Sequence, residues 1–376
     1  MAIYVVKAND TVNSIAGEYN IPSTTIISDN QLVPPYQLVI GQALYLDTMD
    51  AQPSRSLAVG GYAYPFISNY VLRETLPYLT DLYIFSYGFT DEGYLIPPNL
   101  PVDRMLETSK EFGKNSILVL TPLDSRGRFN NNLITTMVQT ESVKNNLINQ
   151  LIATIQAKGY QGADIDFEYI KATDRDAFTA FVQEAASRLN ALGYTCSIAL
   201  APKIADDQPG LLYQGKDFPA LGAAVNHALL MTYEWGYKYG PPMAVAPLNK
   251  VRQVVDYAIT QIPNTKLDLG IPNYGYDWPL PYVRNETIAT TIGNVEAIQI
   301  AIANNARIEF DETAQSPYFY YTRDGMEHVV WFEDVRSIQR KFDLVKEYGL
   351  RGVGYWQIMR WWRANWLLLV DNFTIQ

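Results

Sequence analysis

The sequence is poor in the residues that support redox and zinc chemistry. Among 376 residues it has one cysteine, Cys196, and two histidines, His227 and His328. A single cysteine cannot form a disulfide bond within the chain, and the apolar run around it (CSIALAP) predicts a core residue. Two histidines far apart in sequence argue against a histidine-based zinc site and against a Ser-His-Asp triad.

Basic charge and long apolar runs are also scarce. The 29 Lys and Arg residues against 39 Asp and Glu residues give a formal net charge of −10. This balance argues against nucleic acid and anionic membranes as partners, because both attract basic surfaces. No stretch of about 18 apolar residues is present that could span a membrane. The start, MAIYVVKAND, lacks a basic segment followed by an apolar one, so we expect no signal peptide.

Aromatic residues, in contrast, are abundant. They make up 13% of the chain, with 27 Tyr and 7 Trp. Two interpretations are open, a large core or a surface on which sugar rings stack. The length of the chain suits a large catalytic domain joined to a small module, and its 48% apolar content supports a sizeable core.

The stretch Gln161–Ile170, QGADIDFEYI, concentrates acidic residues. Asp164, Asp166 and Glu168 alternate with apolar residues, which is the period of a β-strand and places the three acids on one face. Like charges in a row are costly to hold unless a site uses them, so this stretch is a candidate functional site. Closely spaced carboxylates are also natural ligands of Mg²⁺ or Ca²⁺, and that alternative is open on this pattern alone.

Residues 1–47 are predicted to form a separate unit with the order strand, helix, helix, strand. Tyr4-Val5-Val6-Lys7 begins it and Gly41-Gln42-Ala43-Leu44 closes it. The unit resembles a LysM module, a small βααβ domain, and the resemblance implies binding of N-acetylglucosamine-containing glycans such as peptidoglycan or chitin. Residues 48–56 are polar and contain a proline, so we interpret them as a linker.

From residue 57 to residue 376, strand-like apolar runs alternate with helical patterns, which predicts an α/β fold, a (β/α)8 TIM barrel. A doubly wound open sheet is disfavoured because no glycine-rich turn follows the first run. Alternating stretches and a hairpin turn in the long gap before the last run predict a small α+β insertion around 278–335, between strands seven and eight. The predicted strands are Leu57–Tyr64, Leu82–Phe89, Ser116–Leu123, Ala163–Tyr169, Thr195–Ala201, Ala228–Glu234, Leu267–Tyr274 and Gly352–Ile358.

Motifs at the ends of these strands resemble those of glycoside hydrolase family 18. QGADIDFEYI is similar to the family motif DGxDxDxE on strand four, with Gln161 in place of the leading Asp. Met231-Thr232-Tyr233-Glu234 is similar to the strand-six motif, with Glu in place of its final Asp. Trp356 occupies the place of the strand-eight tryptophan, and Gly270–Tyr276 matches the strand-seven pattern.

The resemblance implies substrate-assisted, retaining hydrolysis without an enzyme nucleophile, a metal or a cofactor. Glu168 would donate the proton, and Asp166 would orient the acetamido group of the substrate with help from Tyr233. We expect Asp166 to keep Glu168 protonated through like-charge repulsion. Tyr64, near the end of the first strand, could line the cleft or pack in the core. The expected substrate-binding residues are Asp164, Met231, Glu234, Trp356, Tyr276 and Tyr64. Asp164 points into the middle of the barrel, so we also expect it to form hydrogen bonds within the core and to support Asp166.

The LysM-like unit together with MTYEWGY (231–237) and SPYFYYT (316–322) resembles one subgroup, the spore cortex-lytic N-acetylglucosaminidases of endospore-forming bacteria. This resemblance implies hydrolysis of β-1,4 bonds in peptidoglycan fragments from the spore cortex. It also implies a spore-associated enzyme made in the cytoplasm of the mother cell, and we expect a monomer. A chitinase and a non-catalytic lectin of the same fold are the alternatives.

Overall fold

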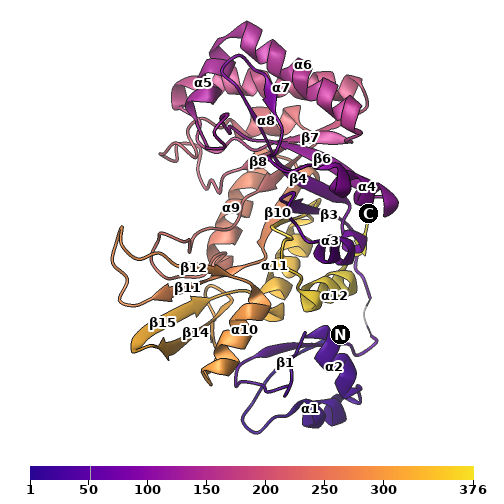
Figure 1. The fold of residues 1–376 in the computed structure, drawn as a ribbon, viewed down its shortest axis with the longest axis vertical. Coiled ribbons are helices and arrows are strands. Elements are labelled where there is room, and N and C mark those ends of the chain that lie inside the picture. Colours follow the sequence, from indigo (N-terminus) through magenta and orange to yellow (C-terminus); the bar gives the residue numbers. More distant parts are fainter. Residues whose placement is uncertain (51) are drawn as a thin grey trace.

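The computed structural model describes residues 1–50 and 52–376, and a small N-terminal unit lies at one end of a larger barrel (Figure 1). In this unit β1 (Ala2–Val5) pairs antiparallel with β2 (Ala43–Leu46), and α1 (Val12–Tyr19) and α2 (Ser23–Asp29) connect them. Thr11 begins α1 with a capping box, because its side chain accepts a hydrogen bond from the Ser14 backbone N–H. This is the predicted βααβ order. The linker predicted at 48–56 includes Ala51, which lies outside the described residues.

Within the described residues, eight parallel strands close a barrel in the order of the sequence. Closure is direct, because Gly354 of the last strand lies opposite Gly60 of the first. The prediction of a TIM barrel is therefore confirmed, and an open sheet is excluded. The barrel strands are β3 (Ser56–Ala63), β4 (Asp81–Phe89), β6 (Asn115–Leu120), β7 (Gly162–Ile165), β8 (Thr195–Leu200), β9 (His227–Leu230), β10 (Leu267–Pro272) and β16 (Gly352–Trp356).

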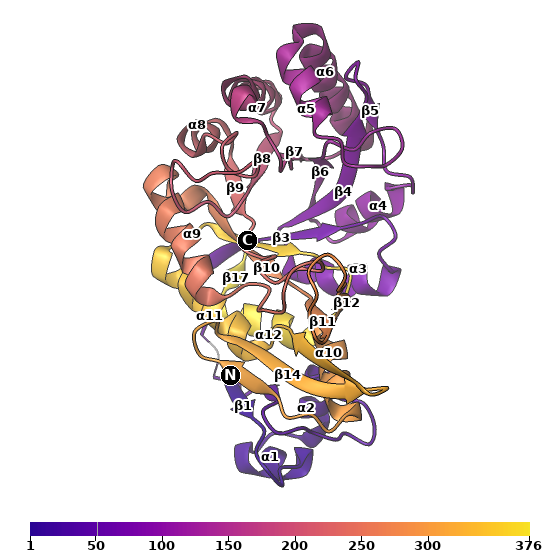
Figure 2. The ribbon, with the colours of Figure 1, turned by 90° about the vertical axis from the view of Figure 1, so that its left-hand side faces the viewer.

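Helices surround these strands, as Figure 2 shows. The main core lies between the two layers, where apolar side chains that point outward from the strands meet the inner faces of the helices. The short strands β5 (Leu95–Ile96) and β17 (Thr374–Ile375) pair with the barrel strands β4 and β3, respectively. The helices are α3 (Asn69–Thr75), α4 (Asp103–Glu111), α5 (Asn132–Gln139), α6 (Glu141–Lys158), α7 (Arg175–Ala191), α8 (Phe218–Ala224), α9 (Leu248–Gln261), α11 (Val335–Tyr348) and α12 (Arg363–Asn372). In the part of the chain that the structure describes, no helix is long and apolar enough to cross a membrane.

The fourth barrel strand is shorter than predicted. β7 ends at Ile165, whereas the alternating pattern predicted a strand to residue 169. The Asp166 N–H still donates to the Leu120 carbonyl at 2.9 Å, but the chain then leaves its neighbours. The apolar side of the pattern nevertheless continues, because the Phe167 ring stacks against Phe181 of α7 with 6.0 Å between centroids. Alternation thus identified the two faces correctly and overestimated the length of the strand.

The segment between β10 and β16 forms the predicted α+β insertion. Its sheet is antiparallel, and its two longest strands are joined by the left-handed residues Asp324 (φ 53°) and Gly325 (φ 77°), which suit a tight hairpin turn. The sheet has the strand order β12-β11-β15-β14-β13, and α10 packs on one of its faces. Its elements are β11 (Gly275–Pro279), β12 (Thr290–Ile292), α10 (Asn294–Ala303), β13 (Glu309–Asp311), β14 (Ser316–Arg323) and β15 (Met326–Trp331).

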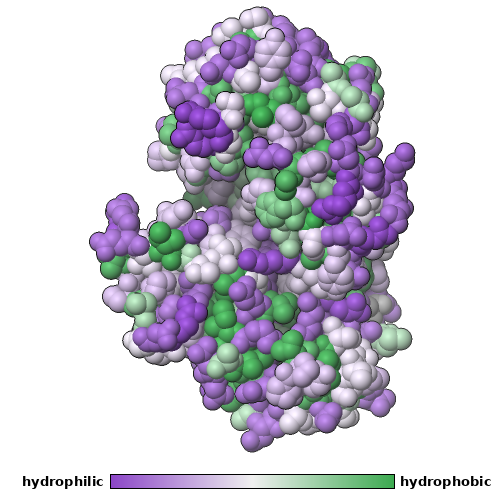
Figure 3. All heavy atoms as spheres, viewed as in Figure 1, coloured by the Kyte–Doolittle hydropathy of each residue, from purple (hydrophilic) through white to green (hydrophobic). Residues whose placement is uncertain are grey.

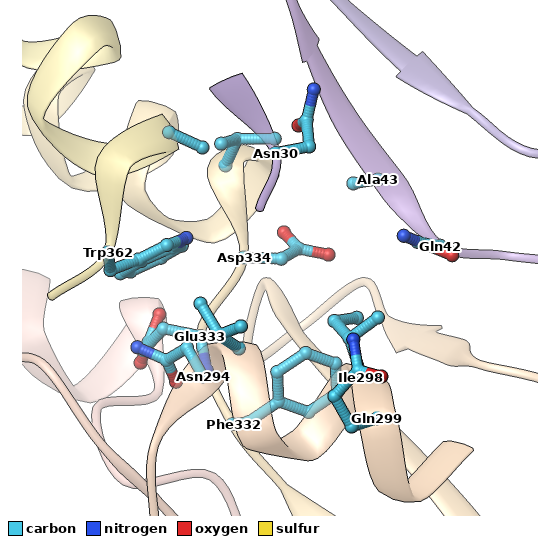
Figure 4. Close-up of a pocket in the computed structure, with 13 residues that line it drawn as sticks. Asn30, Gln42, Ala43, Asn294, Ile298, Gln299, Phe332, Glu333, Asp334 and Trp362 are labelled. Carbon is cyan, nitrogen blue, oxygen red and sulfur yellow. Dashed lines mark hydrogen bonds between the residues drawn. The ribbon is translucent and has the colours of Figure 1, made fainter. Parts of the chain in front are cut away.

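The N-terminal unit contacts both α12 and the insertion directly. Asp29 forms an ion pair with Arg363 at 3.0 Å, the Tyr45 hydroxyl donates to Asp371 at 2.6 Å, and the Ile308 N–H donates to the Ile40 carbonyl. A pocket remains between the two units, with a volume of 30 Å³ (Figure 4). This volume holds about two water molecules and is too small for a sugar ring. Its polar lining includes Asn30 and Gln42 from the N-terminal unit and Asn294, Glu333 and Asp334 from the larger domain.

Candidate active site

A pocket of 610 Å³ opens at the C-terminal ends of the barrel strands, where active sites of this fold lie. On the face that Figure 3 shows, the molecule is hollowed between the upper part of the barrel and the lobe built on β14 and β15. The pocket brings together residues that are widely separated in the sequence. The predicted site residues that line it are Tyr64, Asp166, Glu168, Met231, Tyr233, Glu234 and Trp356.

Asp164 lies beneath the pocket rather than on its wall. Its side chain is completely buried and accepts hydrogen bonds from the Ser197 hydroxyl at 2.6 Å and the Tyr62 hydroxyl at 3.0 Å. Burial raises the pKa of Asp164, and these two hydrogen bonds oppose the increase. Among the roles expected for this residue, the structure therefore favours support of the site over contact with substrate.

Asp166 and Glu168 form a closely coupled pair on the pocket wall. Burial, followed by repulsion from Glu168 and Asp164, raises the pKa of Asp166 well above its ordinary value. Burial also raises the pKa of Glu168. Like-charge repulsion was the cause predicted for Glu168, but it raises the pKa of Asp166, whereas burial raises the pKa of Glu168. Both raised pKa values favour the protonated form, and a carboxyl group that keeps its proton near neutral pH is what a general acid requires.

The segment after β9 supplies the opposite wall through Met231, Tyr233 and Glu234. Glu234 has a φ of 67°, a left-handed conformation that is strained for a residue with a side chain and often marks a functional site. Its carboxylate accepts hydrogen bonds from the hydroxyls of Tyr274 and Tyr276, the latter at 2.9 Å. Tyr276 therefore reaches the pocket through Glu234, although it was predicted to contact substrate.

Trp356, the last residue of β16, forms an apolar floor. Its ring packs edge-on against Phe85 with 4.9 Å between centroids and against Tyr64 with 6.0 Å. Tyr64 also stacks on Phe66, which is exposed at the rim. The two possibilities for Tyr64, cleft lining and packing, are thus both realised. A flat aromatic floor suits the C–H face of a pyranose ring.

Several lining residues were missed by the sequence analysis. Most of them are aromatic, and three aromatic side chains on loops, Phe129, Tyr169 and Tyr237, are exposed. Tyr169 directly follows Glu168 in sequence, and Tyr237 belongs to the MTYEWGY motif, so position next to a site residue could have identified both. Nothing local marked Phe129 or Tyr213. Of the two interpretations of the aromatic content, core and sugar-binding surface, the structure shows large aromatic groups in both places.

The carboxylates do not form a metal cage. In residues 1–50 and 52–376, no group of three or more His, Cys, Asp or Glu side chains is arranged to hold a metal ion. Asp164 is already engaged by two hydroxyl donors, which removes it from a shared ligand set with Asp166 and Glu168. This geometry gives no support to the Mg²⁺ or Ca²⁺ alternative.

Comparison with known families agrees with this geometry. The model for glycosyl hydrolases family 18 matches residues 127–360, which is more than half of the chain. The chain belongs to this family. It is therefore a glycoside hydrolase, and its N-terminal unit is a LysM domain, because the LysM model matches residues 4–47.

Similarity to individual members of family 18 extends over the whole chain. The cortical fragment-lytic enzyme of Bacillus subtilis is 38% identical, and the alignment covers 100% of this chain and 99% of that protein. The crystal structure of the spore cortex-lytic enzyme SleL of Bacillus cereus has a TM-score of 0.94 at 32% identity, covering 100% of this chain and 98% of that one. SleL of Bacillus megaterium gives a TM-score of 0.93 at the same identity and coverage.

Proposed function

We propose that this family 18 enzyme hydrolyses β-1,4 bonds in N-acetylglucosamine-containing peptidoglycan, in particular spore cortex fragments, by substrate-assisted retaining catalysis. The LysM domain would hold the glycan, and the barrel would cut it. The relatives whose names refer to cortex lysis match this chain along its full length, and this supports cortex fragments as the substrate. An enzyme with this substrate acts at the spore.

The environment of the Asp166 carboxylate is the observation that supports this mechanism. Its side chain is buried, and one carboxylate oxygen, Oδ1, has no hydrogen-bond partner in the described part of the chain. A buried acceptor without a donor costs about 1–3 kcal/mol. The N–H of a substrate acetamido group is a donor of the right kind, and its binding would satisfy Asp166 and orient the acetamido oxygen toward the anomeric carbon.

The reaction then proceeds in two steps. Glu168 donates its proton to the glycosidic oxygen while the acetamido oxygen attacks C1, which breaks the glycosidic bond and forms an oxazolinium ion. Asp166 stabilises the positive charge of this ion, with the hydroxyl of Tyr233 beside it. Glu168, now a carboxylate, takes a proton from water as the water attacks C1. The bond between C1 and the acetamido oxygen breaks, which restores the N-acetyl group, and the configuration at C1 is retained.

Mass spectrometry of the products tests this function. The full chain is incubated with purified spore cortex fragments and, separately, with N-acetylglucosamine oligomers, and Glu168→Gln serves as the control for contaminating activity. We expect new reducing ends at N-acetylglucosamine residues of the cortex fragments, with the β configuration in the first product seen by NMR. Cleavage of the chitin oligomers alone would assign the enzyme to chitin. Binding without cleavage of either glycan would identify a lectin.

A further inference from the structure

A lysine without an assigned role lies next to the catalytic carboxylates. Lys216 belongs to the loop that joins β8 to α8, and its side chain is 0% exposed. A buried ammonium group is costly unless neighbouring groups compensate its charge. Among the described residues, no acidic group lies within ion-pair distance of Lys216, in contrast to the other completely buried lysine, Lys341, which pairs with Glu333 at 2.8 Å.

Two contacts place Lys216 beside the pair. The Lys216 ammonium donates to the Ala199 carbonyl of β8 at 3.2 Å. Because Ile165 of β7 lies opposite Ile198, the next residues along the two strands are Asp166 and Ala199, so this carbonyl sits at the level of Asp166. On the other side, the loop is tied to the segment that follows Glu168, since the Ile170 N–H donates to the Leu211 carbonyl at 3.0 Å.

The backbone before Lys216 is packed too closely on that segment to move away. A Cβ atom added to Gly215 would lie 2.4 Å from the Ile170 carbonyl oxygen, which is a forbidden contact. Glycine is therefore required at position 215 for the loop to come this close. The Lys216 side chain therefore extends from backbone packed on the segment after Glu168 to the Ala199 carbonyl, which lies at the level of Asp166.

Among the described residues, Lys216 is the cation that acts on Asp166 and Glu168. Burial lowers the pKa of Lys216 to about 8. The negative charges of Asp166, Glu168 and Asp164 oppose this decrease. Every other titratable group that acts on the pair in the described part of the chain is an acid or a phenol. These groups are Tyr62 and Tyr64 from β3 and its end, Asp164 from β7, Tyr169, and Tyr233 and Glu234 from the segment after β9.

We propose that Lys216 is a positioning residue for the reaction: its buried ammonium is the counter-ion of Asp166 and Glu168 and limits the pair to one shared proton. Without this cation, three neighbouring carboxyl groups in a low-dielectric site would retain a second proton at mildly acidic pH. Asp166 would then be neutral and unable to stabilise the oxazolinium ion. This role rests on the proposed function, because it assumes that the pair performs the chemistry.

The pH profile of kcat/KM tests the proposal, measured with tetra-N-acetylchitotetraose as the probe and with the full chain. Removing an adjacent cation raises both apparent pKa values of a carboxyl pair, by about one unit or more. For Lys216→Met we therefore expect the acidic and basic limbs to move together to higher pH by about one unit, with about tenfold lower activity on the acidic limb. Lys216→Arg, which keeps the charge, should leave the acidic limb in place even if kcat falls.

The matched control is Lys203→Met. Lys203 is also buried, lies on the same loop and donates to the Lys216 carbonyl at 3.5 Å, but it does not act on the pair. We expect this variant to leave both limbs in place. An unshifted profile in an active Lys216→Met variant, or an equal shift in Lys203→Met, would overturn the proposal. Absence of activity in the wild type would instead overturn the proposed function.

A second measurement needs neither turnover nor the Lys216→Met variant. Lysine-selective ¹⁵N NMR follows the titration of Lys216 in the wild type and in the double variant Asp166→Asn/Glu168→Gln. Because interaction between charges is reciprocal, loss of the negative charge of the pair should move the Lys216 titration to lower pH by about one unit. An identical titration in both proteins would show that Lys216 does not sense the pair.

Discussion

The two ends of the barrel hold buried carboxylates in opposite electrostatic states. At the C-terminal ends of the strands, the pKa values of Asp166 and Glu168 are raised, and Asp166 has an oxygen without a partner. At the N-terminal ends, Asp268 of β10 lies 2.6 Å from the Arg351 guanidinium and 2.9 Å from Nδ1 of His227. Burial alone would raise the pKa of Asp268, but these neighbours bring it below its ordinary value.

The difference shows how one barrel separates stability from reactivity. The carboxylate at the N-terminal end is satisfied and charged, so it fixes β9, β10 and β16 relative to one another. The carboxylates at the C-terminal end have no ion-pair partner among the described residues, so burial raises their pKa values.

The largest effect is expected at Glu168. Glu168→Gln keeps the shape of the side chain but removes the transferable proton, so kcat should fall by about 10²–10⁴-fold. The free energy of unfolding should stay the same or rise slightly, because a buried acid near another acid is removed. Steady-state kinetics on cortex fragments and urea unfolding check the two parts. Near-normal turnover would contradict the assigned role.

At the N-terminal end of the barrel, the same carboxyl-to-amide change at Asp268 should lower stability and leave kcat unchanged. Asp268→Asn leaves the Arg351 guanidinium without its charged partner, and we expect the free energy of unfolding to fall by about 3 kcal/mol. The folded fraction should keep its kcat, since Asp268 is remote from the pocket. Urea unfolding and kinetics at low temperature measure both. A loss of kcat with unchanged stability would mean that the two ends are not independent.

The pH dependence of stability should also differ in sign. The folded pKa of Asp268 is lowered, so its contribution is present above the unfolded pKa of about 4 and is lost as the pH falls through the folded value. The difference between wild type and Asp268→Asn should therefore shrink on acidification. Asp166 and Glu168 have raised values, so their contribution is complete below about pH 4 and declines as the pH rises.

Thermal unfolding between pH 3 and pH 8 tests this contrast. Glu168→Gln should gain stability relative to wild type as the pH rises, whereas Asp268→Asn should lose it. Parallel curves for the two variants would show that both clusters respond to pH in the same way, which would remove the distinction.

The smallest effect is expected at Glu234. Glu234→Asp shortens the side chain by one methylene and withdraws the carboxylate from the Tyr274 and Tyr276 hydroxyls. Loss of one or two such hydrogen bonds corresponds to about 0.5–1.5 kcal/mol each, so kcat/KM should fall by about 3–10-fold. Tyr276→Phe, which removes one of the two donors, is the matched control and should give a smaller loss. A loss above about 100-fold would assign Glu234 a direct part in the chemistry.

The sequence alone was sufficient to predict the LysM unit, the barrel and the convergence of most candidate site residues on one pocket. Periods of two and 3.6 residues record which side of a strand or helix is buried, and this information is local. The acids of β7, the segment after β9 and Trp356 follow strands, and strands of a closed barrel end on one rim. Their convergence could therefore be predicted without knowing any distance.

Only the tertiary structure decided the pKa values of these side chains and the contacts that hold them in place. The end of β7 at Ile165, the tyrosine donors to Glu234 and the approach of Lys216 to Asp166 all depend on loops packed against distant segments. No period in the sequence encodes such contacts. Burial of a charge and the identity of its neighbours set its protonation, and both are properties of the folded chain. The sequence thus named the acids, and the fold determined the burial and the neighbours that set their pKa values.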